Sequence, residues 1–131
     1  MAKRCETFGH TADVGLAAEA DTPGELFEAL AEGLAELICE RRTVRPRQRR
    51  QVAVRAEDRG ALAVDFLGEV LARIQTEHFL VASTAVTAEL SGEPYDPGRH
   101  ELATEVKAVT YHQLRIEPRN GRWTGRIILD L

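Results

Sequence analysis

The sequence has few of the residues and motifs that mark the common enzyme classes. Its only serines are Ser83 and Ser91, and neither lies in a nucleophile elbow or another motif that activates a hydroxyl. It has no G-x-G-x-x-G motif after a predicted strand and no phosphate-binding P-loop. The sequence therefore gives no support for nucleophilic serine catalysis or for nucleotide binding through these motifs.

Cysteines and long apolar segments are scarce as well. The two cysteines, Cys5 and Cys39, form no C-x-x-C pair and no Cys/His array, which favours reduced thiols that pack as small hydrophobic residues. The longest apolar run is too short to cross a bilayer, and residues 1–8 contain no apolar signal-peptide core. These absences predict a cytoplasmic protein with no membrane partner.

Two neighbouring segments each lack charge of one sign. From Cys5 to Glu40 there are nine acidic residues and no lysine or arginine, whereas from Arg41 to Arg55 there are seven arginines and no acid. This segregation predicts an acidic and a basic surface region that steer charged partners. The arginine segment contains no aromatic residue, so base stacking is not indicated. Phosphate contacts and a solvated basic loop both remain open for it.

Length and composition are those of an ordinary globular protein. A chain of 131 residues fits one domain, residues 1–131, and can bury one hydrophobic core. The hydrophobic fraction of 44% and the charged fraction of 29% are typical of soluble proteins.

Two segments have the apolar spacing of amphipathic helices. Thr22-Pro23-Gly24-Glu25 is a capping box with proline at the first helical position, and it predicts a helix of about 18 residues ending near Glu40. Asp58 is the predicted cap of a second helix. The outer face of the first helix is predicted to be acidic, a face that water must solvate or a basic partner must cover. The second helix has an apolar stripe. The acidic residues are Glu25, Glu28, Glu32 and Glu36, and the stripe is Leu62, Phe66, Leu67, Val70, Leu71 and Ile74.

The remaining segments alternate as strands do. Residues 5–20 predict two strands around the loop from Gly9 to Asp13, and further strands are predicted over Gln51–Ala56 and Phe79–Leu90. Residues 91–98 are predicted to be an ordered turn segment. The fold class predicted is α+β, with two amphipathic helices packed on a mainly antiparallel sheet in a single-domain sandwich.

The C-terminal segment contains the strongest hairpin signal. Asn120-Gly121 between two β-prone runs predicts a two-residue turn, with Arg119 opposite Arg122. Extending this register outward pairs Ile116 with Gly125, Leu114 with Ile127 and Tyr111 with Asp130. One face of the hairpin is then apolar, and the other face is polar and includes Lys107 and Asp130. The apolar face consists of Leu114, Ile116, Trp123, Ile127 and Leu129.

Oxygen donors occur near both ends of the chain. Asp13 follows a polar loop, and Asp130 stands beside the α-carboxylate of Leu131. If these groups meet, they offer three hard oxygen ligands suited to calcium, magnesium or manganese rather than to zinc. Alternatively, Asp13 caps a turn and Asp130 is solvated.

Two further residues are candidates for a functional role. His10 lies in the loop before Asp13 and is either a ligand or a hydrogen-bonding loop residue. Lys107 falls on the predicted face of Asp130 and is either functional or an ordinary exposed strand lysine. His78, His100 and His112 have no spacing relation to one another, and we interpret them as structural.

Several motifs together resemble the archease family. They are His10-Thr-Ala-Asp-Val-Gly15, Val64-Asp-Phe-Leu-Gly-Glu-Val-Leu71, the long segment from Gly92 to His112, and the ending Ile127-Ile-Leu-Asp-Leu131. The resemblance covers essentially the whole chain, and its 92–112 block is highly specific.

The resemblance implies a function that the residues alone do not. Archeases are accessory proteins of the RtcB-type RNA ligase that joins exons in tRNA splicing; they promote its guanylylation from GTP and its multiple turnover, and are not enzymes themselves. The family's metal site matches Asp13, Asp130 and Leu131 here, with calcium favoured over magnesium or manganese. Lys107 matches the lysine of the Val-Lys-Ala-Val-Thr-Tyr block, which the resemblance implies to be functional.

The chain departs from the family pattern at three positions. Gly9 stands where the family usually has an aspartate before the histidine, which removes a third side-chain carboxylate. Phe66 and Gly68 replace a tryptophan and an asparagine in the second helix. Two alternative functions remain open: a stand-alone metal-dependent hydrolase with His10 as general base, and a chaperone-like or nucleic-acid-binding module that uses the arginine segment. With the ligase as partner, contact with tRNA or other RNA through the ligase complex also remains open.

Overall fold

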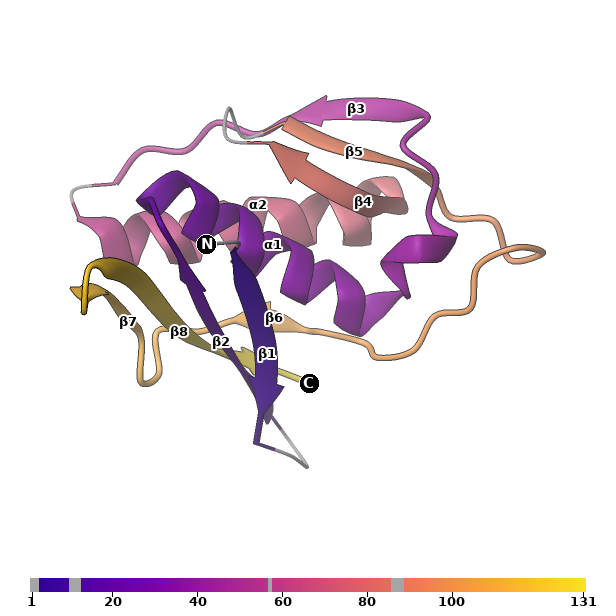
Figure 1. Cartoon of the computed structure of the whole chain (residues 1–131). Coiled ribbons are helices and arrows are strands. Elements are labelled where there is room, and N and C mark those ends of the chain that lie inside the picture. Colours follow the sequence, from indigo (N-terminus) through magenta and orange to yellow (C-terminus); the bar gives the residue numbers. More distant parts are fainter. Residues whose placement is uncertain (1–2, 10–12, 57, 86–88) are drawn as a thin grey trace.

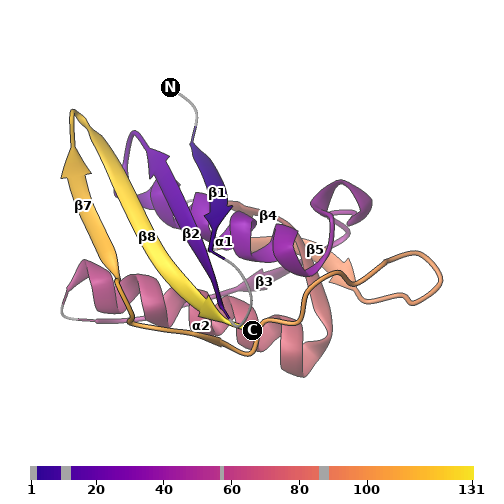
Figure 2. The same cartoon turned by 90° about the horizontal axis from the view of Figure 1, so that it is seen from below.

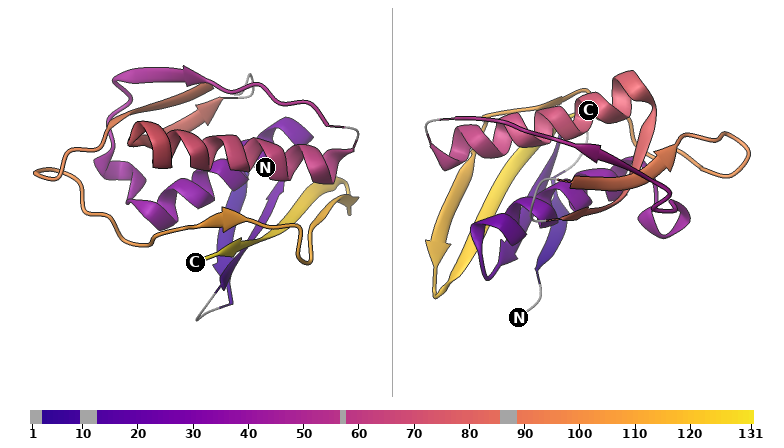
Figure 3. Two further views of the ribbon diagram at one scale, coloured as in Figure 1. Left: turned by 180° about the vertical axis from the view of Figure 1, so that it is seen from behind. Right: turned by 90° about the horizontal axis from the view of Figure 1, so that it is seen from above.

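Two helices lie between two antiparallel sheets (Figure 1 and Figure 3). The computed structural model describes residues 3–9, 13–56, 58–85 and 89–131, with the backbone alone at 82–85. The helices are α1 (Pro23–Ile38) and α2 (Arg59–Glu77), and a short 3-10 turn, η1 (Arg41–Thr43), follows α1. Helix α1 contacts strands of both sheets. This arrangement confirms the predicted α+β fold class.

The larger sheet has five strands and is built around the last one. Strands β1 (Arg4–Phe8), β2 (Asp13–Ala20), β8 (Arg122–Asp130) and β6 (Ala108–Val109) lie in that order, and β7 (Arg115–Arg119) also pairs with β8. Figure 2 shows β8 between β2 and β7. The smaller sheet has the order β3 (Gln48–Gln51), β5 (Glu89–Pro94) and β4 (Phe79–Ala85).

The hydrophobic core joins both sheets through the helices. Leu26, Leu30 and Leu34 of α1 are fully buried because their spacing places them on one helical face. They belong to one apolar cluster with residues from the larger sheet, from α2 and from the smaller sheet. Among these partners the fully buried ones include Leu16, Ile127, Leu129, Leu67, Val70, Phe79 and Leu90.

The predicted caps of both helices are present. The Thr22 hydroxyl accepts a 3.2 Å hydrogen bond from the amide of Glu25, and the Asp58 carboxylate accepts one of 2.8 Å from the amide of Ala61. Each cap satisfies an amide that the helix itself leaves without a partner and stabilises its helix by about 1 kcal/mol. Helix α1 ends at Ile38, two residues before the predicted end.

Basic residues of the same chain cover part of the acidic outer face of α1, which is the second of the two alternatives predicted for it. Glu28 is buried, and Lys3 donates a 2.8 Å hydrogen bond to its Oε1. Lys3 and Arg41 also form ion pairs with Glu32, at 3.3 and 3.6 Å. Partial burial alone lowers the pKa of Lys3, but the hydrogen bond to Glu28 and the charge of Glu32 outweigh it and raise that pKa. Basic residues that flank the acidic segment in sequence thus cover part of it.

Two strand predictions in the middle of the chain were wrong. The strand expected over Gln51–Ala56 is β3 at Gln48–Gln51, and residues 52–56 continue as irregular chain. The single strand expected over Phe79–Leu90 is instead the two strands β4 and β5, paired antiparallel with a register shift between Val81 and Ser83. Residues 86–88, part of the predicted strand, lie outside the described residues. Strand β5 runs to Pro94, so the predicted turn segment forms from Tyr95 onward.

The predicted C-terminal hairpin is present, but its register holds only near the turn. Arg119 lies opposite Arg122 and Ile116 opposite Gly125, as expected. Beyond Arg115 the chain leaves the ladder: Gln113 has a left-handed φ of 54°, and the Leu114 amide bonds back to the Tyr111 carbonyl at 3.2 Å. The pairing resumes with β6, so Ala108 rather than Tyr111 lies opposite Asp130.

Candidate functional site

Asp13 and Asp130 are direct cross-strand partners. Antiparallel pairing of β2 with β8 places the first residue of β2 opposite the last residue of β8. Partners in such a ladder point to the same face, with Cβ atoms about 4.5–5.5 Å apart. Both residues are exposed. Two like charges at this separation repel each other, and a bound cation would remove that cost.

Leu131 follows Asp130 and lies next to the Asp13–Asp130 pair. Its side chain is partly buried and packs against the core, which anchors the residue directly after Asp130. Among the described residues, no group of three His, Cys, Asp or Glu side chains could hold a metal ion. The donors brought together are therefore two aspartates, with the α-carboxylate of Leu131 as the expected third. This all-oxygen set fits calcium, magnesium or manganese and lacks the nitrogen and sulfur ligands that zinc prefers.

The loop before Asp13 contains the other expected neighbour. His10 lies outside the described residues, so its predicted role stays a prediction. Gly9 has a φ of 83°, in the left-handed region, and a Cβ at that position would lie 3.9 Å from the backbone oxygen of Asp13. The backbone of Gly9 thus passes close to that of Asp13.

Lys107 is joined to the acidic pair through its backbone. Its amide donates a 2.7 Å hydrogen bond to the Asp130 carbonyl. Its side chain is exposed and lines a groove of about 530 Å³ between β6 and α2, together with Asp65 and Glu69. Gln75 of α2 holds the segment in place, because its side-chain amide donates to the carbonyl of Val106 at 3.0 Å. The predicted shared face of Lys107 and Asp130 depended on the extended hairpin register and is wrong, because Ala108 is the residue opposite Asp130 and Lys107 lines the groove beside α2. The lysine is joined to the acidic pair through its backbone.

A buried ionic network lies away from this site, and sequence reasoning missed it. The Glu93 carboxylate accepts hydrogen bonds from the Arg45 amide at 2.8 Å, from His100 Nε2 at 2.9 Å and from the Arg99 guanidinium. The Asp96 amide donates to His100 Nδ1 at 3.0 Å, so the proton of the neutral ring is on Nε2 and points at Glu93. The seven-residue spacing of a glutamate and a histidine around a Pro-Gly turn is the signal that could have suggested this pair.

This network has a clear electrostatic consequence. Burial alone would raise the pKa of Glu93, but the hydrogen bonds from Arg45, Arg99 and His100 outweigh it and lower the pKa to about 2. The predicted structural role of His100 agrees with its full burial against Glu93 and its ring contact with Tyr95.

Most of the arginine segment is occupied by partners within the chain. Arg50 bonds to Glu77 at 2.9 Å and lies over the Phe79 ring at 4.6 Å. Arg49 and Arg47 form ion pairs with Glu89 and Glu93, both at 3.7 Å. The arginines of this segment thus have acidic partners in α2 and in the smaller sheet, and both alternatives, phosphate contacts and a solvated basic loop, stay open.

The two cysteines are free thiols, as expected from their spacing. Burial, with a smaller contribution from Glu6, raises the pKa of the Cys5 thiol to about 12, so this thiol is not a nucleophile. Across the described residues we find no helix with the length and apolar character needed to span a membrane.

Comparison with known proteins places the whole chain in one group. Residues 6–131 match the model of the Archease protein family. The chain is 38% identical to protein archease of Thermococcus gammatolerans, covering 98% of this chain and 99% of the relative, and 36% identical to that of Methanopyrus kandleri, covering 96% and 98%. The solution structure of Methanobacterium thermoautotrophicum protein 1598 superposes with a TM-score of 0.81 at 30% identity, covering 97% of this chain and 98% of that one.

Proposed function

Because this chain belongs to the archease family, we propose that it is a metal-binding accessory protein of the RtcB-type RNA ligase of tRNA splicing. In this role it promotes guanylylation of the ligase from GTP, and hence multiple turnover, without catalysing a reaction alone. The observation that carries the proposal is the pairing of Asp13 with Asp130, with Lys107 bonded to the Asp130 backbone. These are the residues that match the functional positions of the family.

The chemistry of the site supports this proposal. Asp13, Asp130 and the Leu131 carboxylate would hold a divalent cation, which supplies positive charge to a phosphoryl group during nucleotidyl transfer. Asp13 and Asp130 stand on paired strands of one antiparallel ladder, which places both carboxylates on one face of the sheet. Lys107, whose backbone bonds to Asp130, adds a positive charge in the adjoining groove, and positive charges placed where negative charge develops stabilise a transition state.

Measuring ligase guanylylation with and without this protein tests the proposal. The wild-type protein should raise the extent and rate of guanylylation, whereas Asp13→Asn, Asp130→Asn and Lys107→Ala should each abolish most of the stimulation. Glu101→Gln is a matched control, because Glu101 is exposed and forms no ion pair with the described residues.

Two further measurements separate the alternatives. Single-turnover joining by ligase that is already guanylylated should not depend on any of these variants. The protein alone, incubated with GTP and with generic phosphoesters, should show no turnover; measurable hydrolysis that Asp13→Asn removes would instead establish the metal-dependent hydrolase. Full stimulation by all three site variants would show that the site assignment is wrong.

A further inference from the structure

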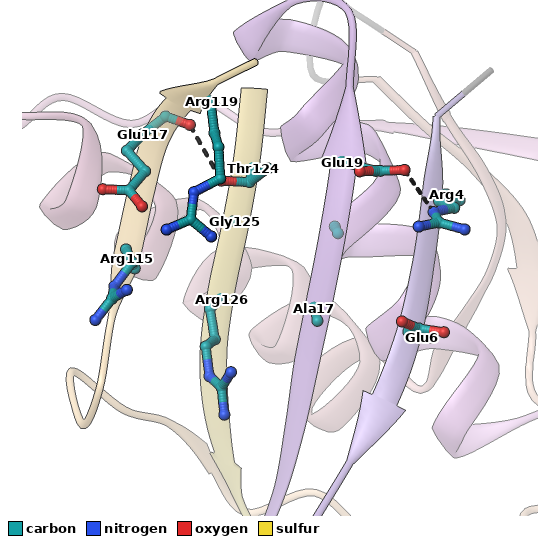
Figure 4. Close-up of a pocket in the computed structure, with 11 residues that line it drawn as sticks. Arg4, Glu6, Ala17, Glu19, Arg115, Glu117, Arg119, Thr124, Gly125 and Arg126 are labelled. Atoms are coloured by element: carbon teal, nitrogen blue, oxygen red, sulfur yellow. Dashed lines mark hydrogen bonds and ion pairs between the residues drawn. The ribbon is translucent and has the colours of Figure 1, made fainter. Parts of the chain in front are cut away.

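The larger sheet has one face turned to the helices and one face free of them. In Figure 4 the side chains of the free face lie in front of the strands, and the helices lie behind. A shallow groove of about 220 Å³ crosses this face over β1, β2, β8 and β7. Its charged lining residues are Arg4, Glu6, Glu19, Arg115, Glu117, Arg119 and Arg126.

The arginines of the β7–β8 hairpin carry uncompensated charge. Arg115 is the cross-strand partner of Arg126, and like charges in that position destabilise a sheet. Arg115, Arg119 and Arg126 are exposed, and none of the three forms an ion pair within the described parts of the chain. The hairpin thus keeps an arrangement that costs stability and that an anionic ligand would relieve.

Arg126 lies over an aromatic ring. Its guanidinium lies 3.9 Å from the centroid of the Phe8 ring. The ring itself covers Gly15, where a Cβ would come within 2.0 Å of the Phe8 Cζ atom. The missing side chain at Gly15 therefore lets Phe8 lie across β2 as a support for Arg126. A guanidinium held in this way presents its outer plane to a base and its N–H edges to phosphate oxygens.

The positive charge is confined to one side of the groove. On β1 and β2, Arg4 forms a 2.6 Å ion pair with Glu19, and Glu6 adds negative charge. On β7 and β8, Glu117 is the one acid among the groove's arginines. Arg115 and Arg119 lie four residues apart, about 14 Å along the strand. Their positive charge is therefore spread along β7 rather than concentrated at one position.

We propose that this arginine-lined face binds single-stranded RNA. Arg115 and Arg119 contact backbone phosphates, and Arg126 contacts a phosphate while a base stacks on its Phe8-supported plane. The choice of RNA among polyanions rests on the proposed function, since an RNA ligase brings single-stranded RNA ends to its accessory protein. A chain of acidic residues alone, such as polyglutamate, would satisfy the charges, but it has no ring to occupy the guanidinium plane.

The test measures binding of the whole protein, without ligase, to a labelled oligouridylate of about twelve nucleotides. The wild type should bind with a clear salt dependence. The triple variant Arg115→Gln, Arg119→Gln, Arg126→Gln should lose at least about tenfold in affinity. The plot of the logarithm of the association constant against the logarithm of salt concentration should become less steep by about 2, since each single-strand phosphate contact contributes about 0.7 to the slope. Arg126→Lys keeps the charge and should lose about fivefold through stacking alone.

A second triple variant removes the same charge elsewhere. Arg42→Gln, Arg49→Gln, Arg55→Gln changes three exposed arginines of the basic segment and should bind RNA within about twofold of the wild type. Thermal melts confirm that both triple variants are folded. The proposal is overturned by absence of wild-type binding, by equal losses in the two triple variants, or by equally tight, equally arginine-dependent binding of polyglutamate. None of these results bears on guanylylation by the ligase, which is measured separately.

Discussion

The backbone amide of Lys107 donates a 2.7 Å hydrogen bond to the carbonyl of Asp130. This bond fixes the backbone of the proposed functional lysine next to the proposed metal ligands, whatever the side chain at position 107. We therefore expect Lys107→Ala to change the free energy of unfolding by less than about 0.5 kcal/mol, as surface substitutions usually do. Stimulation of ligase guanylylation should fall sharply, and Lys107→Arg should restore part of it because the charge returns. A variant that melts early would instead assign the lysine a structural role.

Removing one carboxylate of the Asp13–Asp130 pair should separate metal binding from stability. Without divalent cations, Asp13→Asn and Asp130→Asn should each stabilise the protein by about 0.2–1 kcal/mol, because opposed like charges on a sheet repel. Calcium at about 100 times its Kd should stabilise the wild type by about 2.7 kcal/mol and leave both variants unchanged. Thermal melts with calcium, magnesium, manganese or chelator measure both effects. A calcium shift that survives in both variants would place the cation elsewhere.

Acid should weaken the fold through Glu93. The folded-state pKa of Glu93 is about 2, below its usual 4.5, so the ionised carboxylate is the form that folding favours. Its contribution is complete above about pH 4.5 and is lost as the pH falls toward 2. Glu93→Gln should cost about 1–3 kcal/mol at neutral pH, because buried donors lose their acceptor, and should flatten the decline in stability between pH 5 and 2.

Denaturant unfolding across that pH range measures the Glu93 effect. Glu89→Gln is the matched control on the same strand, since its partner Arg49 lies 3.7 Å away in an exposed pair, and we expect a loss below about 1 kcal/mol. If the free energy of unfolding of Glu93→Gln falls between pH 5 and 2 as steeply as that of the wild type, the pH dependence belongs to other carboxylates.

The contact of Phe8 with Gly15 should behave as a coupled pair. Gly15→Ala places a Cβ where the Phe8 ring lies, so the ring must move, and overpacking of this kind costs about 1–3 kcal/mol. In a Phe8→Leu background the same substitution should cost clearly less, because the ring is gone. A double-mutant cycle on the free energy of unfolding measures this coupling. Equal costs in both backgrounds would show that Gly15 is needed for its backbone rather than for the ring.

Local signals in the sequence predicted local structure well. The Thr22 and Asp58 caps and the Asn120-Gly121 turn involve residues within a few positions of one another, and all three are present. The predictions failed where distant segments decide. Apolar alternation at 51–56 did not produce a strand, because β5 offers its edge to residues 48–51 instead. Likewise, the register of the C-terminal hairpin could not be extended past the left-handed Gln113.

The candidate site also depends on contacts between distant segments, which local sequence signals do not predict. Nothing in the residues alone predicts that Asp13 and Asp130 meet, because their contact depends on β2 choosing β8 as its neighbour. The family resemblance named the residues of the acidic pair, and the sheet topology explains how they come together. The Glu93 network remained hidden for a related reason: its Arg45 amide comes from a segment 48 residues away in the chain.

The position of β8 has a consequence for synthesis of the protein. It is the last strand in chain order and yet an inner strand of its sheet, with β2 on one side and β6 and β7 on the other. During translation β2 emerges early, and its second edge stays unpaired until β8 has been synthesised. Pairing of such distant segments is slow, and open strand edges promote aggregation in the meantime. A nascent chain of this protein therefore cannot complete its larger sheet until β8 is available to pair with β2.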